Sequence, residues 1–303
     1  MTTPRQLLSR DVLRAVQRIR IRTRRVVADV MAGAYRSVFR GAGIEFDEVR
    51  EYSHTDDARA IDWNVTARLG RPHVRTYVEE RELTVVLLVD VSGSLAFTSA
   101  ERTKSEIAAE VCAILGFAGL ENGDKVGLLL FTDQVEVFVP PRKGVAHGLR
   151  LLRELLNLQT SRRQTDIGSA IAYADRWLRR RSILFVVSDF LSGGGGHGGW
   201  IEPLERAARR HEIVAVRLTD ARERSFPPAG LLCWRDLETD ALVEVDLSSR
   251  RVREGLARRA REHDEALRRE LARLRVDLID VDPLGPVDRP LVAFFQARAR
   301  RGR

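Results

Sequence analysis

Short apolar segments alternate with amphipathic segments along most of the chain. Five apolar runs have the length and composition of buried strands, and the segments between them carry apolar residues at helical spacing. This alternation predicts an α/β fold with a doubly wound, mostly parallel sheet and helices on both faces. The predicted strands are LTVVLLV, KVGLLLF, SILFVVS, HEIVAVRL and RVDLIDV, and the predicted helices span residues 100–120, 145–158, 166–180, 198–210, 250–274 and 287–300.

Two segments depart from the alternation. VEVFV follows KVGLLLF after a turn at residues 132–134, which predicts a short antiparallel edge strand. The segment GLLCWRDLETDALVEVDL, at residues 230–247, has two β-like runs and predicts an inserted hairpin.

The region before the first strand divides into two parts. Residues 1–40 carry leucine, valine and isoleucine at helical spacing among arginines, which predicts an amphipathic helical arm. Such a helix either packs on its own domain, which we favour, or lies on an anionic membrane surface. Residues 41–82 combine β-like pieces, turn residues and many paired charges, and predict a small subdomain. Residues 83–303 then form the α/β domain.

Polar side chains stand where three loops reach one edge of the predicted sheet. The first strand ends in Asp-Val-Ser-Gly-Ser, the helix at 166–180 begins at Thr-Asp, and SILFVVS is followed by an aspartate. Ligands of open α/β sheets bind at the carboxyl ends of the strands. In an extended segment, side chains two residues apart point the same way. The residues that we expect to converge are Asp90, Ser92, Ser94, Thr165 and Asp189.

Hydroxyl and carboxylate oxygens are ligands of hard cations. We therefore predict a site for a divalent cation, Mg²⁺ in the first place, with Mn²⁺ and Ca²⁺ as alternatives. Each residue also has a simpler structural role available. Ser92, Thr165 or Asp166 can cap a helix, and Asp90 or Asp189 can form a turn. Their conjunction in three loops favours the metal site.

This arrangement resembles the metal-ion-dependent adhesion site (MIDAS) of von Willebrand factor A domains. The resemblance covers residues 83–303, and all five positions are filled. It implies that the hydroxyls of Ser92, Ser94 and Thr165 bind the ion directly, and that the two aspartates act directly or through water. It also implies an open coordination position that accepts a carboxylate of a partner protein.

The segment GAGIEFDEVREYSHTDDARAIDW, followed by NVTARLGRPHVRTYVEERE, is similar to the signature of a bacterial family known as domain of unknown function 58. The later TDARERSFPPAGLLCWRDLETDALVEVD and LVAFFQARARR also resemble that family. Its members accompany MoxR-type AAA+ ATPases. The resemblance therefore implies a MoxR-type ATPase as partner, a role as adaptor or co-chaperone, and a protein client with an exposed acidic residue.

Charged residues surround Trp63 in this signature, and two hypotheses account for them. They form a buried ion-pair network that docks the subdomain to the α/β domain, which we favour, or a recognition surface for the ATPase. The residues concerned are Arg50, Asp56, Asp57, Arg59, Asp62 and Arg68.

Composition and apolar run length bear on the cellular location of the protein, on its cysteines and on nucleic-acid binding. The apolar runs fall well short of the roughly 20 residues of a transmembrane helix, and no leader opens the chain, so we expect a cytoplasmic protein, with peripheral membrane association through the arm as the alternative. Cys112 and Cys233 have no disulfide or zinc spacing and are expected to be buried thiols. The formal charge of +8 leaves nucleic-acid binding through the arginine-rich surface as a second, less favoured function.

Known catalytic motifs are missing. The position two residues after Asp90 holds Ser92 and not the second aspartate of a haloacid dehalogenase-type phosphatase, and neither Gly-x-Ser-x-Gly nor G-x-G-x-x-G follows a strand. We therefore expect a protein that is not an enzyme. Hydrolysis of a phosphate ester at the metal is the remaining enzymatic alternative.

Overall fold

The computed structural model describes residues 16–21, 23, 26–27, 35, 45–53, 56–78, 82–96, 102–158, 164–191, 198–220, 226–235 and 241–301. The chain divides into two compact units. The first comprises Met1–Val38 with Thr84–Arg303, and the second comprises Phe39–Leu83. The predicted subdomain at 41–82 lies within the second unit, and most of the predicted arm at 1–40 lies outside the described residues.

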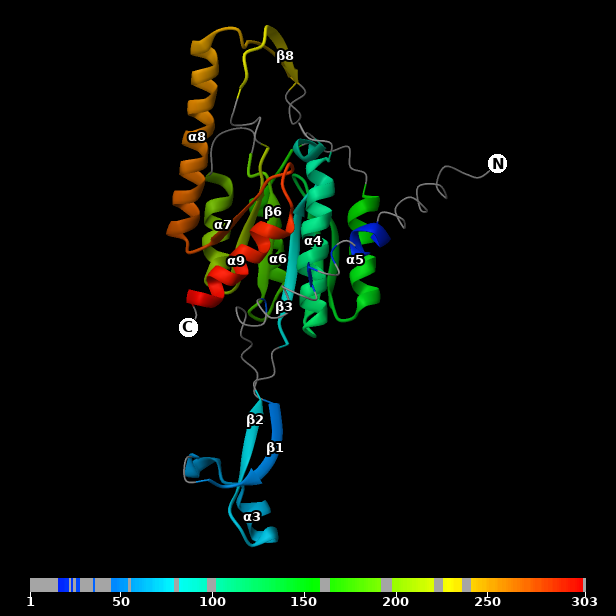
Figure 1. Cartoon of the computed structure of the whole chain (residues 1–303), viewed down its shortest axis with the longest axis vertical. Helices are drawn as coiled ribbons and strands as arrows, with labels where there is room; N and C mark the ends of the chain where they lie inside the picture. Colours follow the sequence, from blue (N-terminus) through cyan, green and yellow to red (C-terminus); the bar gives the residue numbers. More distant parts are fainter. Residues whose placement is uncertain are drawn as a thin grey trace, which may run out of the picture. The chain divides into compact units, whose positions relative to one another are not determined.

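A six-stranded sheet forms the centre of the first unit (Figure 1). Its order is β10-β7-β6-β3-β4-β5, and all neighbouring pairs are parallel except β4 and β5. This confirms the predicted fold class, the five predicted parallel strands and the antiparallel edge strand, although β10, at the other edge of the sheet, is only partly buried. The strands are β3 (Thr84–Asp90), β4 (Lys125–Phe131), β5 (Val135–Arg142), β6 (Ile183–Ser188), β7 (Glu212–Leu218) and β10 (Asp277–Val281).

Among the described residues, six helices that the sequence predicts to within a few residues cover the two faces of this sheet. The core on one face is made with α6, α7 and α8, whereas α4, α5 and α9 lie on the other face, nearer the viewer in Figure 1. The helices are α4 (Lys104–Glu121), α5 (Val145–Asn157), α6 (Ile167–Trp177), α7 (Gly198–Ala208), α8 (Arg250–Arg273) and α9 (Asp288–Arg301).

Strand β3 is apolar throughout because both of its faces are buried. Val86 and Leu88 belong to the core cluster with α6 and α7, whereas Leu87 points to the opposite face, where a Cβ at Gly116 of α4 would lie 3.6 Å from its Cδ1. Burial on both faces is the reason that a central parallel strand lacks polar positions. Its first buried polar side chain is Asp90, at the carboxyl end.

The connections create a switch point beside β3. From β3 the chain proceeds outward to β4 and β5, then returns to β6 on the other side of β3 and continues to β7 and β10. The loops after β3 and β6 therefore leave the sheet in opposite directions, and open α/β sheets bind ligands in the crevice that such a reversal leaves.

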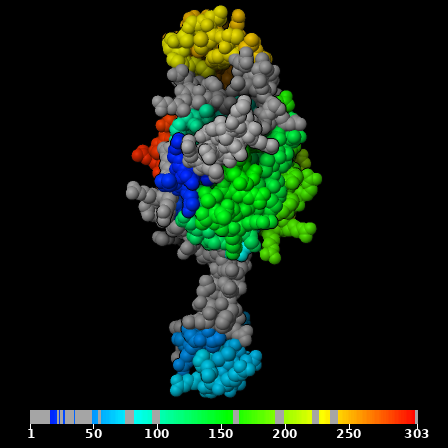
Figure 2. All heavy atoms as spheres, turned by 90° about the vertical axis from the view of Figure 1, so that its right-hand side faces the viewer, coloured from blue at the N-terminus to red at the C-terminus, as the bar shows by residue number. Residues whose placement is uncertain are grey.

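The predicted hairpin is present as β8 (Leu231–Arg235) paired antiparallel with β9 (Leu242–Asp246), drawn in yellow in Figure 2. It leaves several large apolar side chains exposed, among them Leu231, Leu242 and Val243. Cys233 is exposed on this hairpin, so its prediction as a buried thiol is wrong, whereas Cys112 in α4 is buried as predicted. A two-stranded ribbon has no second layer to cover both of its faces, and this accounts for the exposure.

The described part of the N-terminal arm belongs to the first unit. Residues 16–21 are helical, and Val16 and Tyr35 are buried. The Tyr35 ring lies 5.7 Å from that of Phe295 in α9, measured between centroids. This agrees with an arm that packs on its own domain. No helix in the described ranges combines the length and the apolar composition needed to cross a bilayer.

The second unit contains β1 (Glu45–Glu51) paired antiparallel with β2 (His73–Val78), the short 3₁₀ helix η2 (Ala58–Ala60) and α3 (Trp63–Leu69). Arg50 forms a bidentate pair with Asp56, with distances of 2.8 and 2.6 Å. Trp63 is 70% exposed.

Within the second unit these charges leave Trp63 exposed, whereas their docking of the subdomain to the α/β domain stays a prediction. Asp57 accepts a hydrogen bond from the Arg59 backbone at the start of η2, and Asp62 caps α3 through the backbone N–H groups of Asn64 and Val65. Aspartate is a preferred N-cap residue, and the sequence pattern does not distinguish this local role from a long-range ion pair. The recognition surface stays a prediction.

Candidate metal centre

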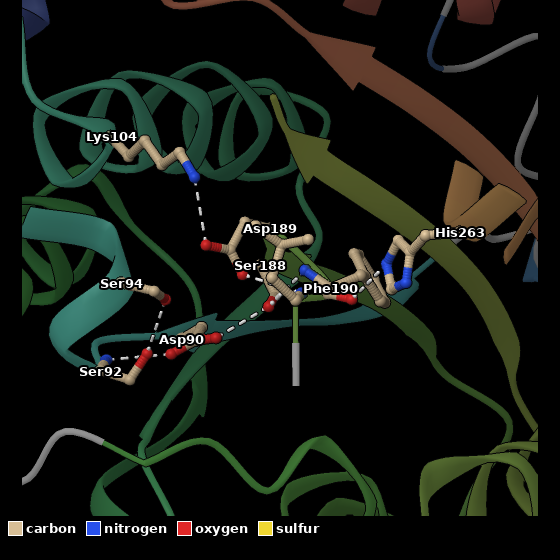
Figure 3. A network of polar contacts seen from close by, with 9 residues as sticks. Asp90, Ser92, Ser94, Lys104, Ser188, Asp189, Phe190 and His263 are labelled. Atoms are coloured by element: carbon tan, nitrogen blue, oxygen red, sulfur yellow. Dashed lines mark hydrogen bonds and ion pairs between the residues drawn. The ribbon is translucent and has the colours of Figure 1, made fainter. Parts of the chain in front are cut away.

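Asp90 is the last residue of β3, beside the end of β6, and has no exposed surface. The parallel register pairs Val89 with Val187, which brings the next residues, Asp90 and Ser188, side by side. Asp90 Oδ1 accepts a hydrogen bond from the Ser92 backbone N–H at 2.9 Å, and Oδ2 accepts one from the Ser188 hydroxyl at 2.7 Å (Figure 3). Both carboxylate oxygens are thus held by donors of the chain.

The two serines of the first loop lie together. Their Oγ atoms are 3.1 Å apart. The loop curls into the 3₁₀ helix η3 (Gly93–Ala96), and the Leu95 N–H donates to the Ser92 carbonyl at 3.3 Å. This turn brings the Ser92 and Ser94 hydroxyls toward one another beside Asp90, as Figure 3 shows.

Asp189 begins the loop after β6 and is also buried. Its Oδ1 accepts from the Leu191 N–H at 3.1 Å, and its Oδ2 lies 3.1 Å from the Lys104 ammonium. The next residue, Phe190, has a left-handed φ of 56°. Its N–H donates to the Ser188 hydroxyl at 3.1 Å, and its carbonyl lies 3.2 Å from a ring nitrogen of His263 in α8. These contacts hold the loop in an uncommon backbone conformation.

Thr165 lies at the same edge of the sheet because a backbone hydrogen bond of the next residue, Asp166, holds its loop there. The Asp166 N–H donates to the carbonyl of Thr132, the first residue after β4, at 2.8 Å. Strand β4 pairs with β3, and the Val91 N–H donates to the Phe131 carbonyl at 2.9 Å, so the loop of Thr165 and the loop of Ser92 flank adjacent strand ends. The structure thus brings Asp90, Ser92, Ser94 and Asp189 into one cluster and Thr165 to the adjoining strand end.

The helix cap of α6 is Asp166 and not Thr165. Asp166 accepts hydrogen bonds from the backbone N–H of Ser169 at 2.9 Å and from its hydroxyl at 2.6 Å. The Thr165 Oγ1 atom is buried and has no hydrogen-bond partner within the described structure. Leaving a buried hydroxyl unsatisfied costs about 1–3 kcal/mol, and such groups in native proteins call for an explanation, such as an ion.

The centre carries unbalanced negative charge. Burial, and then the nearby charge of Asp189, raise the pKa of Asp90 to about 7, although the hydrogen bonds from Ser92 and Ser188 act in the opposite direction. Lys104 neutralises one of the two carboxylates. The remaining charge favours a cation at this edge of the sheet.

The donor set fits a hard divalent cation. It consists of three hydroxyls and two carboxylates, and oxygen ligands suit Mg²⁺, Mn²⁺ and Ca²⁺ rather than soft transition metals. Among the residues that the structure describes, no three His, Cys, Asp or Glu side chains are grouped as an imidazole-, thiolate- or carboxylate-rich metal centre. An ion at this edge would therefore depend on the hydroxyls, and the unsatisfied Thr165 Oγ1 supports that role.

Sequence reasoning missed two members of this network, Ser188 and Lys104. Ser188 ends a run of buried residues directly before Asp189, where a polar residue is conspicuous. Lys104 is one of only three lysines in the arginine-rich chain and is the first residue of α4. Neither signal reveals the partner of the side chain, because the contacts join residues 98 and 85 positions apart.

Together, the parallel sheet and the buried oxygen cluster at its switch point define a doubly wound α/β domain with a candidate binding site at the carboxyl edge. The family described as "Protein of unknown function DUF58" matches residues 48–266. Uncharacterized proteins of Mycobacterium tuberculosis and Mycobacterium bovis are each 31% identical to this chain, over 95% of it and 90% of their own length. The chain belongs to this family.

Solved structures with a similar course of the chain include two Bacteroides proteins. The conserved hypothetical protein BatB of Bacteroides thetaiotaomicron has a TM-score of 0.49 at 18% identity, covering 72% of this chain and 99% of that one. An aerotolerance-related membrane protein of Bacteroides fragilis has a TM-score of 0.47 at 16% identity, with the same coverage of both chains. A von Willebrand factor type A protein of Catenulispora acidiphila has a TM-score of 0.43 at 11% identity, covering 74% of this chain and 43% of that one.

Proposed function

We propose that the protein is a metal-dependent protein-protein interaction module that acts as an adaptor or co-chaperone of a MoxR-type AAA+ ATPase. The client is a protein with an exposed aspartate or glutamate. The observation that carries the metal-dependent part is the buried Thr165 hydroxyl, which has no partner among the described residues and lies beside a cluster of hydroxyls and carboxylates. The similarity of residues 41–82 to the signature of a family that accompanies MoxR-type ATPases supports the choice of partner.

The aspartates and the hydroxyl residues of the centre would have different roles in binding an ion. Asp90 and Asp189 are anchored by donors of the chain, so they supply negative charge from fixed positions. Ser92, Ser94 and Thr165 supply neutral oxygens. Because neutral ligands leave more of the positive charge uncompensated, an ion of the Mg²⁺ type, when bound, would offer an electrophilic position to a partner carboxylate.

Thr165→Val tests the assignment of the hydroxyl. Valine keeps the shape of the side chain and removes only the unsatisfied oxygen. We expect Mn²⁺ binding, measured by calorimetry, to weaken by about tenfold or more, while the free energy of unfolding in EDTA stays equal or rises by about 1 kcal/mol. Thr165→Ser, which restores a hydroxyl, is the matched control. Unchanged Mn²⁺ affinity in Thr165→Val would remove the proposed site.

The partner is tested with the same variants. A MoxR-type ATPase encoded in the same genome is expected to be retained by the immobilised wild-type protein in Mg²⁺ and released in EDTA. If capture of the ATPase needs the ion, as capture of the client does, immobilised Thr165→Val should retain no ATPase in Mg²⁺ or in EDTA. Equal retention with and without EDTA would show that the interaction does not use the metal.

A further inference from the structure

A buried lysine stands beside the candidate metal centre. Lys104 has no exposed surface, and its Nζ atom lies 3.1 Å from Oδ2 of Asp189, whose side chain is 2% exposed (Figure 3). Asp90 adjoins this pair, since its Oδ2 accepts a hydrogen bond at 2.7 Å from the hydroxyl of Ser188, the residue directly before Asp189. One ammonium and two carboxylates therefore share this water-poor edge of the sheet.

The position of Lys104 is unfavourable for the helix that carries it. It is the first residue of α4, directly after Thr103, whose capping box with Glu106 fixes the start of the helix. The positive end of the helix dipole disfavours a cation there, and burial of an ammonium adds a desolvation cost. Helix stability thus gives no reason for a lysine at this position, whereas the Asp189 carboxylate does.

We infer that Lys104 is a specificity-determining residue of the metal centre: it weakens the binding of the divalent ion and reserves positive charge for the partner carboxylate. This inference rests on the proposed function. With Asp90 and Asp189 ionised, the lysine brings the centre from two negative charges to one. A divalent ion then leaves one positive charge, which a client carboxylate neutralises. Without the lysine, the two carboxylates would neutralise the ion by themselves.

Lys104→Met tests this role, because methionine keeps the length of the side chain and removes the charge. Mn²⁺ alone is titrated into wild type, Lys104→Met and Thr165→Val, and binding is followed by calorimetry and by the paramagnetic resonance signal of free Mn²⁺. We expect Lys104→Met to bind Mn²⁺ about tenfold more tightly than wild type or better, since a repelling charge has been removed. A purely structural salt bridge predicts the opposite, because its loss would loosen Asp189.

The outcomes separate this inference from the proposed function. Equal or weaker Mn²⁺ binding by Lys104→Met overturns the inference, while loss of binding in Thr165→Val still upholds the site. If neither wild type nor Lys104→Met binds Mn²⁺, the proposed function fails as well. Should Lys104→Met unfold in EDTA, its near-ultraviolet circular dichroism is followed on adding Mn²⁺. Recovery with Mn²⁺ but not with K⁺ supports the inference, and no recovery overturns it.

Discussion

Asp90 lies in an environment that disfavours its own charge. It is fully buried, its neighbour Asp189 is acidic, and its pKa is raised to about 7. Four donors partly offset this effect at the two aspartates, namely the Ser92 N–H, the Ser188 hydroxyl, the Lys104 ammonium and the Leu191 N–H. Without an ion, the ionised form of Asp90 is unfavourable in the folded state. The free energy of unfolding of the domain therefore depends on pH.

We expect the ion-free protein to lose stability between pH 4 and 7. An unfolded aspartate titrates near 4, whereas folded Asp90 titrates at about 7. The folded state therefore binds more protons in this window, and the free energy of unfolding falls as the pH rises, by an amount on the order of a few kcal/mol. Urea unfolding in EDTA at pH 5 and pH 7.5 measures this.

Asp90→Asn is the comparison for that measurement. Asparagine keeps an acceptor for the Ser92 N–H but cannot ionise. Other groups contribute equally to both proteins, so the difference between their pH profiles isolates Asp90, and the variant is expected to have the flatter profile. Parallel profiles would show that Asp90 does not titrate in this range.

At the scale of elements, glycines show where helices approach closely and where they do not. Gly148 lies where α5 crosses α4, and a Cβ there would be 2.6 Å from Leu120 Cδ1 and 2.9 Å from Phe117 Cε1. Gly255 lies in α8, and a Cβ there would have no atom within 4 Å among its described surroundings. Both residues are in helix interiors, where alanine is intrinsically favoured over glycine.

The two glycine-to-alanine substitutions should therefore change stability in opposite directions. Gly255→Ala is expected to stabilise by about 0.5–1 kcal/mol through helix propensity. Gly148→Ala is expected to destabilise by about 1–3 kcal/mol, because α4 and α5 must move apart. Chemical denaturation of both variants provides the measurement. If Gly148→Ala stabilised the protein, α4 and α5 would be able to move apart for an added methyl group at little cost in free energy.

At the scale of the α/β domain, a buried arginine links elements that are distant in the chain. Arg217 on β7 is 2% exposed, and it pairs with Asp264 of α8 at 2.7 Å and with Asp280 of β10 at 2.6 Å. Arg268 of α8 pairs with Asp280 as well. The long helix α8 is thereby attached to the edge of the sheet by charges in addition to its buried Leu267 and Leu271.

Removal of the buried Arg217 charge is expected to lower the free energy of unfolding far more than removal of an exposed arginine of α8. Arg217→Met leaves two partly buried carboxylates without their main cation and should destabilise by about 3 kcal/mol. Arg250→Ala, which removes an exposed pair with Glu254, should change the free energy of unfolding by less than about 0.5 kcal/mol. Similar values for the two variants would contradict a central role for Arg217.

The sequence predicts the strands and helices because burial on both faces makes β3, β4, β6 and most of β7 apolar, with Arg217 as the exception in β7, while the covering helices carry the helical period. The sequence predicts helix caps only in part. A cap at Thr165 or Asp166 is predicted, and Asp166 is the N-cap of α6. Asp57 and Asp62, for which ion pairs are predicted, are also N-caps. An aspartate before a helix looks the same in sequence whether it serves the helix or a distant arginine.

By itself, the amino-acid sequence determined the order of strands and helices and the loops that carry Asp90, Ser92, Ser94, Thr165 and Asp189, because these follow from local periodicity and from the direction of parallel strands. Only the tertiary structure decided which side chains meet: Ser188 meets Asp90, Lys104 meets Asp189, and the Thr165 hydroxyl meets no partner in the described part of the chain. Contacts between residues far apart in the chain depend on strand register and helix packing, and these leave no local pattern in the sequence.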